Sequence, residues 1–192
     1  GKCRRCGTGI SAQYPLVELT TGAIWVGMLL HHGATPEAAA GAIFLTLLFG
    51  IALTDARFYI IPNEFSLGGA LIGLAFAPFV SGITLAGAVV GAASGYALLW
   101  TVSYLGEKVW KKEVMGGGDV KMMAMVGAFL GVQGMFLTLF LGALFGAVVF
   151  GPISMKTGKL VPFGIFLAAG AAITYAWGDI LVDWYVTNFL TF

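Results

Sequence analysis

Charged side chains are scarce in this sequence of 192 residues: Lys, Arg, Asp and Glu together make up 10% of it, against about 25% in an ordinary soluble domain. Hydrophobic residues make up 59%, and the mean hydropathy is +0.93. So few charges cannot wet the surface of a water-soluble globule of this length. The composition therefore excludes a soluble domain and indicates a chain that folds in a lipid bilayer.

Cysteine is nearly absent too, with only Cys3 and Cys6 in the sequence. The two stand three positions apart in a basic, glycine-flanked segment. This spacing indicates half of a metal-binding motif rather than a structural disulfide. The sequence begins with Gly1 and shows no n-region or h-region of a signal peptide before this pair. We therefore expect that a further segment precedes Gly1 in the whole protein.

The ten basic residues are gathered in four short clusters. These are Lys2 with Arg4 and Arg5, then Arg57 alone, then Lys108, Lys111, Lys112 and Lys121, and finally Lys156 with Lys159. No aromatic platform is interleaved with them, so nucleic acid is not an expected partner. The expected surroundings are the lipid bilayer, and the sequence does not specify an oligomeric state.

Apolar runs bounded by Gly, Pro, Asn or charge predict an all-α bundle of about seven transmembrane spans. We expect spans at residues 16–30, 37–54, 65–80, 83–105, 119–130, 135–153 and 162–185, with a re-entry segment at 56–64 and a turn at 131–134. A spanning helix takes about 20 residues. The fifth span is therefore too short to cross unaided, and it must be buried among the others or enter through a water-filled notch.

The charge pattern supports a count of seven. If the amino terminus lies in the cytosol and the spans alternate, all ten Lys and Arg residues fall on the cytosolic side. The opposite side receives Glu37, Asp179 and Asp183 instead. This is the distribution that the positive-inside rule describes, and a miscounted span would place a basic cluster outside.

Two carboxylates are expected at membrane depth, where such groups are costly and usually functional. Asp55 follows the second expected span, and Asp119 opens the fifth directly after three glycines. The predicted topology places both at the cytosolic edge, on helices that can be neighbours. We therefore expect Asp55 and Asp119 to meet as a pair.

A pair of carboxyl groups a few ångströms apart shares a proton, so that one acts as base and the other as acid. The base activates a water that attacks a peptide carbonyl, and the acid protonates the leaving amine. Gly116, Gly117 and Gly118 have no side chains, so a substrate strand or a facing helix can approach them closely. Lys121 could balance the local charge or reach a lipid phosphate. The pair therefore predicts an aspartic protease, and such proteolysis needs no cofactor.

Other interpretations of the acidic pair stay open. An Asp at the end of a span can be a solvated cap, and Asp119 can be the N-cap of its helix. The pair could bind an ion or a proton in a small transporter, although the sequence has no internal repeat of the kind that secondary transporters show. It could also specify helix packing in a structural membrane subunit.

Three motifs occur in order along the chain. The first, at residues 55–63, is an Asp followed six and seven positions later by Ile61 and Pro62. The second, at 116–121, is a GxGD core with a lysine two residues after its Asp. The third is the Val-Pro-Phe-Gly run at 161–164. Together with the stretch at 3–18, they resemble the prepilin peptidases, also called type IV leader peptidases, which are GxGD aspartic peptidases.

The resemblance implies removal of the short basic leader from type IV prepilins or type II secretion pseudopilins. The site would face the cytosol in the bacterial inner membrane. Asp55 and Asp119 match the family's catalytic aspartates, and Pro62 and Pro162 stand in motifs that shape the site. Many bacterial members also methylate the new amino terminus with S-adenosylmethionine, which would make this methyl donor a cofactor of the full-length protein.

Bacterial members typically carry two CxxC pairs that bind zinc, whereas this sequence has only Cys3 and Cys6. Structural zinc takes four ligands, so we expect the second pair on a missing amino-terminal segment. The alternative is that this chain binds no metal in isolation. We accordingly expect residues 1–15 to be a cytosolic remnant of a zinc-type segment and residues 16–192 to form the transmembrane peptidase domain.

Overall fold

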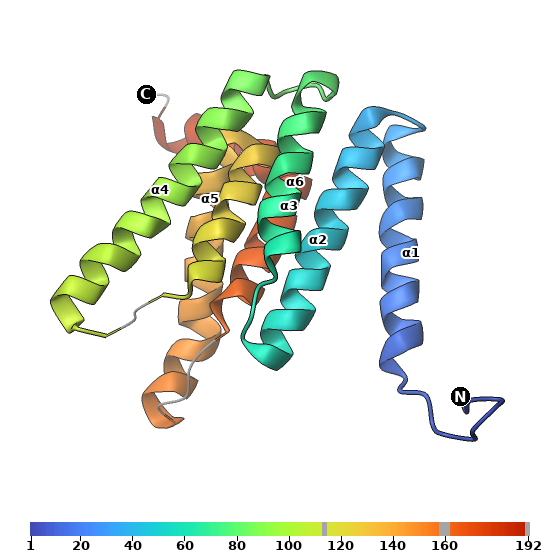
Figure 1. The fold of residues 1–192 in the computed structure, drawn as a ribbon. Helices are drawn as coiled ribbons and strands as arrows, with labels where there is room; N and C mark the ends of the chain where they lie inside the picture. Colours follow the sequence, from blue (N-terminus) through green and yellow to red (C-terminus); the bar gives the residue numbers. More distant parts are fainter. Residues whose placement is uncertain (113–114, 158–161, 191–192) are drawn as a thin grey trace.

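The computed structural model describes residues 1–112, 115–157 and 162–190, with side chains up to residue 149 and again from 162 to 189. Within these residues the chain is a bundle of α-helices without a β-strand (Figure 1). The helices are α1 (Gln13–His32), α2 (Pro36–Phe58), α3 (Asn63–Phe76), α4 (Leu85–Trp110), α5 (Gly117–Thr157) and α6 (Phe163–Tyr185). A short 3₁₀ helix, η1 (Ala77–Phe79), follows α3, and a short π-helix, η2 (Val186–Leu190), follows α6.

The helix α5 is broken at Gly131, whose φ of 67° lies outside the helical region. Residues 117–130 therefore form one segment and residues 132–157 another, which runs back in the opposite direction (Figure 1). Counting these two separately, the described part of the chain has seven helical segments that run alternately up and down. The turn expected at 131–134 is too long. A single glycine with a positive φ, Gly131, is enough to reverse the chain here.

Among the residues that the structure describes, four helical stretches are long and apolar enough to cross a membrane: Pro36–Phe58, Leu85–Trp110, Gly117–Val149 and Phe163–Phe189. The chain is thus an all-α, multi-pass membrane protein, as the composition predicted. The count of seven crossings stays a prediction, since α3 has only 14 residues.

The segment after Asp55 differs from the expectation. Residues 56–58 continue α2, so the predicted re-entry segment at 56–64 is wrong. The helix ends where Tyr59 takes a left-handed conformation with φ 55°, and its N–H donates to the carbonyl of Asp55 at 3.0 Å. Only residues 59–62 lie outside helices before α3 begins. Asp55 therefore stands inside the last turn of α2 and not after it.

The first half of α5 is the centre of the bundle. The helix α5 as a whole contacts α3, α4 and α6, and in its first half the residues from Met122 to Ala128 are almost completely buried. The short fifth helix is thus buried among the others, as predicted, and its methionines serve as packing. A Cβ at Gly91 of α4 would collide with the carbonyl oxygen of Gly127 in α5, so glycine lets these two helix backbones approach closely.

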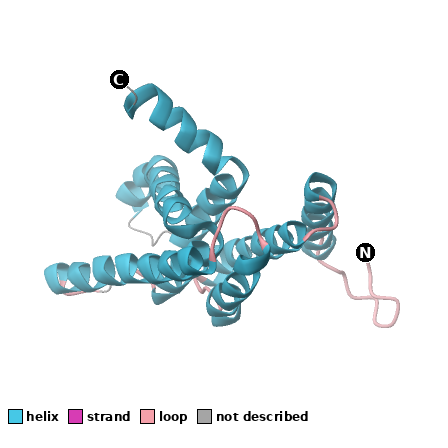
Figure 2. Cartoon of the chain, turned by 90° about the horizontal axis from the view of Figure 1, so that it is seen from above, coloured by secondary structure: helices cyan, strands magenta, loops and turns pink. Residues whose placement is uncertain are grey.

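The amino-terminal part lies at the edge of the bundle. Seen from above, the first residues form a loop beside α1, away from the central helices (Figure 2). The helix α1 contacts α2. The N-cap residue Thr35 of α2 accepts a hydrogen bond from the N–H of Ala38 at 3.3 Å, which satisfies a free amide at the start of that helix.

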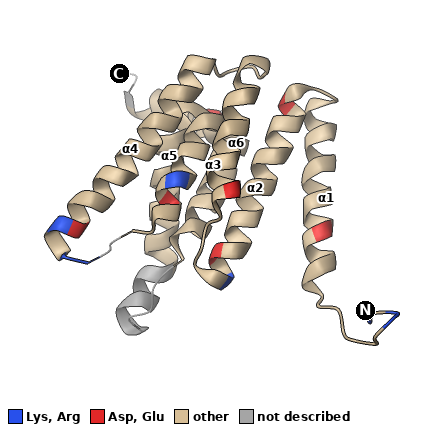
Figure 3. Cartoon of the chain, in the orientation of Figure 1, with Lys and Arg blue, Asp and Glu red and all other residues tan. Residues whose placement is uncertain are grey.

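Basic residues of the described part of the chain gather at one end of the bundle, where α1 begins, α2 and α4 end and α5 begins (Figure 3). Glu37 stands at the opposite end, at the start of α2. This arrangement agrees with the predicted charge partition. The cluster of Lys156 and Lys159 lies outside the described side chains.

Candidate active site

Asp55 is placed by the last turn of α2 and is only 6% exposed. Its Oδ2 accepts a hydrogen bond from the backbone N–H of Ile165 at 3.2 Å. Ile165 lies in the first turn of α6, whose N-cap residue is Pro162 and lacks a side-chain cap. The first amides of a helix need an acceptor and favour negative charge. Asp55, which belongs to α2, thus caps the start of α6 by accepting one of its free amides. The side chain of Pro162 has no acceptor and cannot do so.

Gly164 makes this contact possible. A Cβ at Gly164 would lie 2.8 Å from Oδ2 of Asp55 and 2.9 Å from Cδ1 of Ile61. The late Pro-Phe-Gly motif therefore has a structural explanation in this chain. Pro162 precedes α6 in an extended conformation, and Gly164 leaves room for the carboxylate. Val161, the first residue of the motif, lies outside the described residues.

Asp119 lies in the first turn of α5 and is 8% exposed. Its N–H donates to the carbonyl of Gly116 at 3.1 Å. Because α5 begins at Gly117, Asp119 is inside the helix, and the alternative that made it the N-cap is wrong. A carboxylate in a first turn is favoured by the helix dipole.

Ile61 joins the surroundings of the two aspartates. Its side chain is 9% exposed. A Cβ at Gly118, the residue before Asp119, would lie 2.9 Å from Cβ of Ile61, and the position of Gly164 beside Asp55 meets the same side chain. The carboxylates of Asp55 and Asp119 are close enough to interact electrostatically. The structure therefore brings the two predicted aspartates to one end of the bundle, around a single isoleucine.

The three glycines before Asp119 are not equivalent. Added side chains at Gly117 would meet nothing within 4 Å, and a Cβ at Gly116 would lie 3.4 Å from Oδ2 of Asp119. Only Gly118 is pressed against a neighbour, Ile61. Close approach at this motif thus depends on Gly118, whereas the sequence indicated all three glycines alike.

Lys121 has a specific partner. Its Nζ donates to Oδ1 of Asn63 at 2.9 Å, which ties the start of α5 to the start of α3. Asn63 follows Pro62, whose carbonyl accepts the hydroxyl of Ser66 at 3.1 Å. The contact of Lys121 with Asn63 was not among the expected roles of this lysine. Asn63, Ile61 and Gly164 stand inside the quoted motifs, but nothing local marks them as site residues.

The two cysteines lie in a tight loop before α1. The N–H of Cys3 donates to the carbonyl of Thr8 at 2.8 Å, and that of Gly7, with φ 69°, donates to the carbonyl of Cys3 at 2.9 Å. Hydrogen bonds from the hydroxyl and the amide of Thr8, together with one from Cys3, lower the pKa of the Cys6 thiol to about 7. A low thiol pKa suits a metal ligand. No group of three or more His, Cys, Asp or Glu that could hold a metal occurs among the described residues.

Two family models match the chain. The type IV leader peptidase family matches residues 42–151, a range that contains both aspartates. The bacterial Peptidase A24 N-terminal domain matches residues 1–32, which include both cysteines. No solved structure matches at a significant level.

Relatives that match along most of the chain carry the name prepilin leader peptidase/N-methyltransferase. The relative from Aeromonas hydrophila is 35% identical over 194 residues, which cover 99% of this chain and 67% of the relative. The relative from Pseudomonas aeruginosa is 36% identical, with 97% of this chain and 66% of the relative covered. The relative from Bacillus subtilis is 31% identical, with 97% and 75% covered.

These matches lend no support to the transporter hypothesis. They agree with the resemblance that the three motifs indicated, and they extend over nearly the whole chain. The chain belongs to the type IV leader peptidase family.

Proposed function

We propose that this protein is a membrane-embedded aspartic endopeptidase that removes the short basic leader from type IV prepilins or type II secretion pseudopilins. The observation that carries the proposal is the pairing of Asp55 and Asp119, both more than nine-tenths buried, at one end of the bundle. The relatives are named prepilin leader peptidases, and this name supports the substrate class.

In the proposed reaction, one carboxylate takes a proton from a water as that water attacks the carbonyl carbon of the scissile peptide bond. The other carboxyl group gives its proton to the carbonyl oxygen, which yields a tetrahedral gem-diol. When the C–N bond breaks, the first carboxyl group passes the proton that it took from the water to the leaving amine, and the second takes a proton back from a diol hydroxyl. The amide of Ile165 holds Asp55 by its Oδ2, which orients the carboxylate. The contacts of Ile61 with Gly118 and Gly164 hold the two aspartates in fixed positions relative to each other. Such positioning can account for a large part of a rate enhancement.

The test is leader removal by detergent-solubilised protein that carries Asp55→Asn or Asp119→Asn. Each variant should lose cleavage by at least about 10³-fold, because an amide can neither accept nor supply the proton. Glu64→Gln is the matched control, since Glu64 is an exposed carboxylate at the start of α3, at the same end of the bundle. The masses of both products locate the cleaved bond. Full activity in either Asp variant, with normal thermal unfolding, would end the proposal.

We further propose that this site faces the cytosol in the bacterial inner membrane. The support is the gathering of basic residues at the end of the bundle that carries the aspartates (Figure 3), because cytosolic loops are rich in Lys and Arg. Cysteine accessibility to a membrane-impermeant reagent at exposed positions of both ends tests this orientation.

Two further properties are proposals for the full-length protein. Cys3 and Cys6 would supply two thiolates to a structural zinc, which would hold the amino-terminal segment in place, and two more ligands would have to come from elsewhere. Transfer of a methyl group to the new amino terminus is supported by the relatives' second printed name, N-methyltransferase. Mass spectrometry of the mature product after incubation with S-adenosylmethionine tests it.

A further inference from the structure

The first turn of α5 meets the chain at the start of α3 through two contacts. A Cβ at Gly118 would lie 2.9 Å from Cβ of Ile61, and Nζ of Lys121 donates to Oδ1 of Asn63 at 2.9 Å. Gly118 and Lys121 are three residues apart, so both lie on one face of α5. The face of α5 that meets the start of α3 therefore begins directly before Asp119.

The same piece of chain is also tied to Asp55. Only residues 59–62 separate α2 from α3, and Asp55 lies in the last turn of α2. The N–H of Tyr59 donates to the carbonyl of Asp55 at 3.0 Å. At the far end of this connection, Lys121 holds Asn63. The short connection therefore links the position of one aspartate to the helical turn that carries the other.

The contact at Gly118 sets how closely α5 approaches this connection, but it does not set how α5 is rotated. The contact is apolar, and apolar contacts are non-directional. Residues 116–118, which lead into the helix, are all glycine, and glycine restricts the backbone less than any other residue. A hydrogen bond from a charged donor has a preferred distance and direction. The bond from Lys121 to Asn63 thus supplies a directional restraint that the glycines lack.

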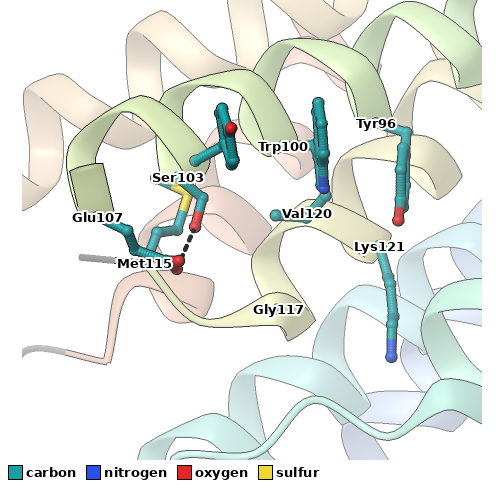
Figure 4. Close-up of a pocket in the computed structure, with 9 residues that line it drawn as sticks. Tyr96, Trp100, Ser103, Glu107, Met115, Gly117, Val120 and Lys121 are labelled. Atoms are coloured by element: carbon teal, nitrogen blue, oxygen red, sulfur yellow. Dashed lines mark hydrogen bonds between the residues drawn. The ribbon is translucent and has the colours of Figure 1, made fainter. Parts of the chain in front are cut away.

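Lys121 also lines a cavity of about 240 Å³ between α4 and the first turn of α5 (Figure 4). On α4 the cavity is lined by the aromatic rings of Tyr96, Trp100 and Tyr104. Figure 4 shows the side chain of Lys121 extending away from the rings, and its Nζ donates to Asn63. The ammonium group is therefore directed at the start of α3 and not at the cavity.

We propose that Lys121 and Asn63 are a pair of positioning residues, whose hydrogen bond holds the first turn of α5 in the orientation that presents Asp119 to Asp55. This inference rests on the proposed peptidase function and names two further residues that the reaction needs. Neither residue touches the reacting atoms. The pair acts on kcat through Asp119, because a displacement of a reacting group by about 1 Å costs about 10²-fold in rate.

The experiment measures KM and kcat for leader removal from a prepilin by the detergent-solubilised protein, at a temperature at which every variant is folded by circular dichroism. Lys121→Met and Asn63→Leu should each lower kcat by about 10-fold or more, with KM changed by less than about 3-fold. The double variant should lose no more than either single variant, because both changes remove the same bond. Asn63→Asp keeps an acceptor for the ammonium group and should keep kcat within about 3-fold of the unaltered protein.

The matched control is Lys112→Met, which makes the same change of charge. Lys112 is an exposed lysine that follows α4, at the end of the bundle where α5 begins. Its replacement should leave kcat and KM within about 3-fold of the unaltered protein, as surface substitutions usually do. A loss in this control equal to that in Lys121→Met would show that net charge, and not the bond to Asn63, sets the rate.

Four other results would also overturn the proposal. These are an unchanged kcat in Lys121→Met, a loss in Asn63→Asp as large as that in Asn63→Leu, losses that add in the double variant, and a rise in KM at unchanged kcat. The last result would instead assign Lys121 to substrate binding. Failure of the peptidase function itself would be distinct, because it would appear as full activity in the Asp55 and Asp119 variants.

Discussion

Replacing Gly164 with alanine should displace Asp55 while leaving its chemistry intact. A Cβ at this position would stand 2.8 Å from Oδ2 of Asp55, whereas ordinary contacts lie at 3.4–4 Å. The oxygen would therefore have to retreat by about 0.6 Å in a closely packed interior. The same oxygen accepts the N–H of Ile165 at 3.2 Å, so the retreat weakens that hydrogen bond, and a bond to a charged group contributes about 1.5–3 kcal/mol.

The expected effect is a fall in kcat. Misplacement of a reacting group by about 1 Å costs about 10²-fold, so we expect a loss of about 10- to 100-fold, which corresponds to about 1.4–2.7 kcal/mol of activation free energy. The assay is leader removal from a prepilin by detergent-solubilised protein, followed by mass spectrometry and combined with thermal unfolding. Because the contact displaces a catalytic carboxylate and not a group that binds the substrate, KM should change little.

Gly68→Ala, in α3, is the matched control, because a Cβ there would meet nothing within 4 Å. It should keep activity within about 3-fold of the unaltered protein, since an open position imposes no shift. If Gly164→Ala is as active as this control, the carboxylate of Asp55 does not depend on its place beside α6. That result would refute the account of the Pro-Phe-Gly motif given above.

Other contacts of the site lead to further expectations. Gly118→Ala should lower cleavage by about 10-fold, because its Cβ would press on Cβ of Ile61 at 2.9 Å and overpacking shifts neighbouring groups; a rate equal to that of the unaltered protein would contradict the contact. Lys121→Met should lower the free energy of unfolding by about 0.5–1.5 kcal/mol, because it removes the 2.9 Å hydrogen bond to Asn63. Asn63→Asp keeps an acceptor for the lysine and should not lower the free energy of unfolding. A double-mutant cycle in thermal unfolding measures the coupling between the two residues. The rate at which iodoacetamide alkylates Cys6 should rise with pH with a midpoint near pH 7, because the lowered pKa of this thiol makes it a thiolate at lower pH. A midpoint near pH 9 would speak against the hydrogen bonds of the loop.

Properties that depend on composition and on local pattern could be predicted from the sequence. The scarcity of charge and the long apolar runs indicated a helical membrane protein, and the structure confirms that class. The positions of Asp55 and Asp119 at the edges of apolar runs indicated their burial, since a carboxylate between such runs has little access to water. Element ends were predicted less well. The helix α2 runs past Asp55 to Phe58, because no proline or glycine interrupts it there.

Only the tertiary structure decided how these pieces meet. The cap that Asp55 provides for α6, the place of Ile61 between Gly118 and Gly164, and the bond from Lys121 to Asn63 join residues from different helices. The sequence by itself determined the membrane as solvent, the helices and the residues that carry the chemistry, because hydropathy and residue type act locally. It could not determine which helix faces touch, because that choice depends on the packing of side chains that are far apart in the chain.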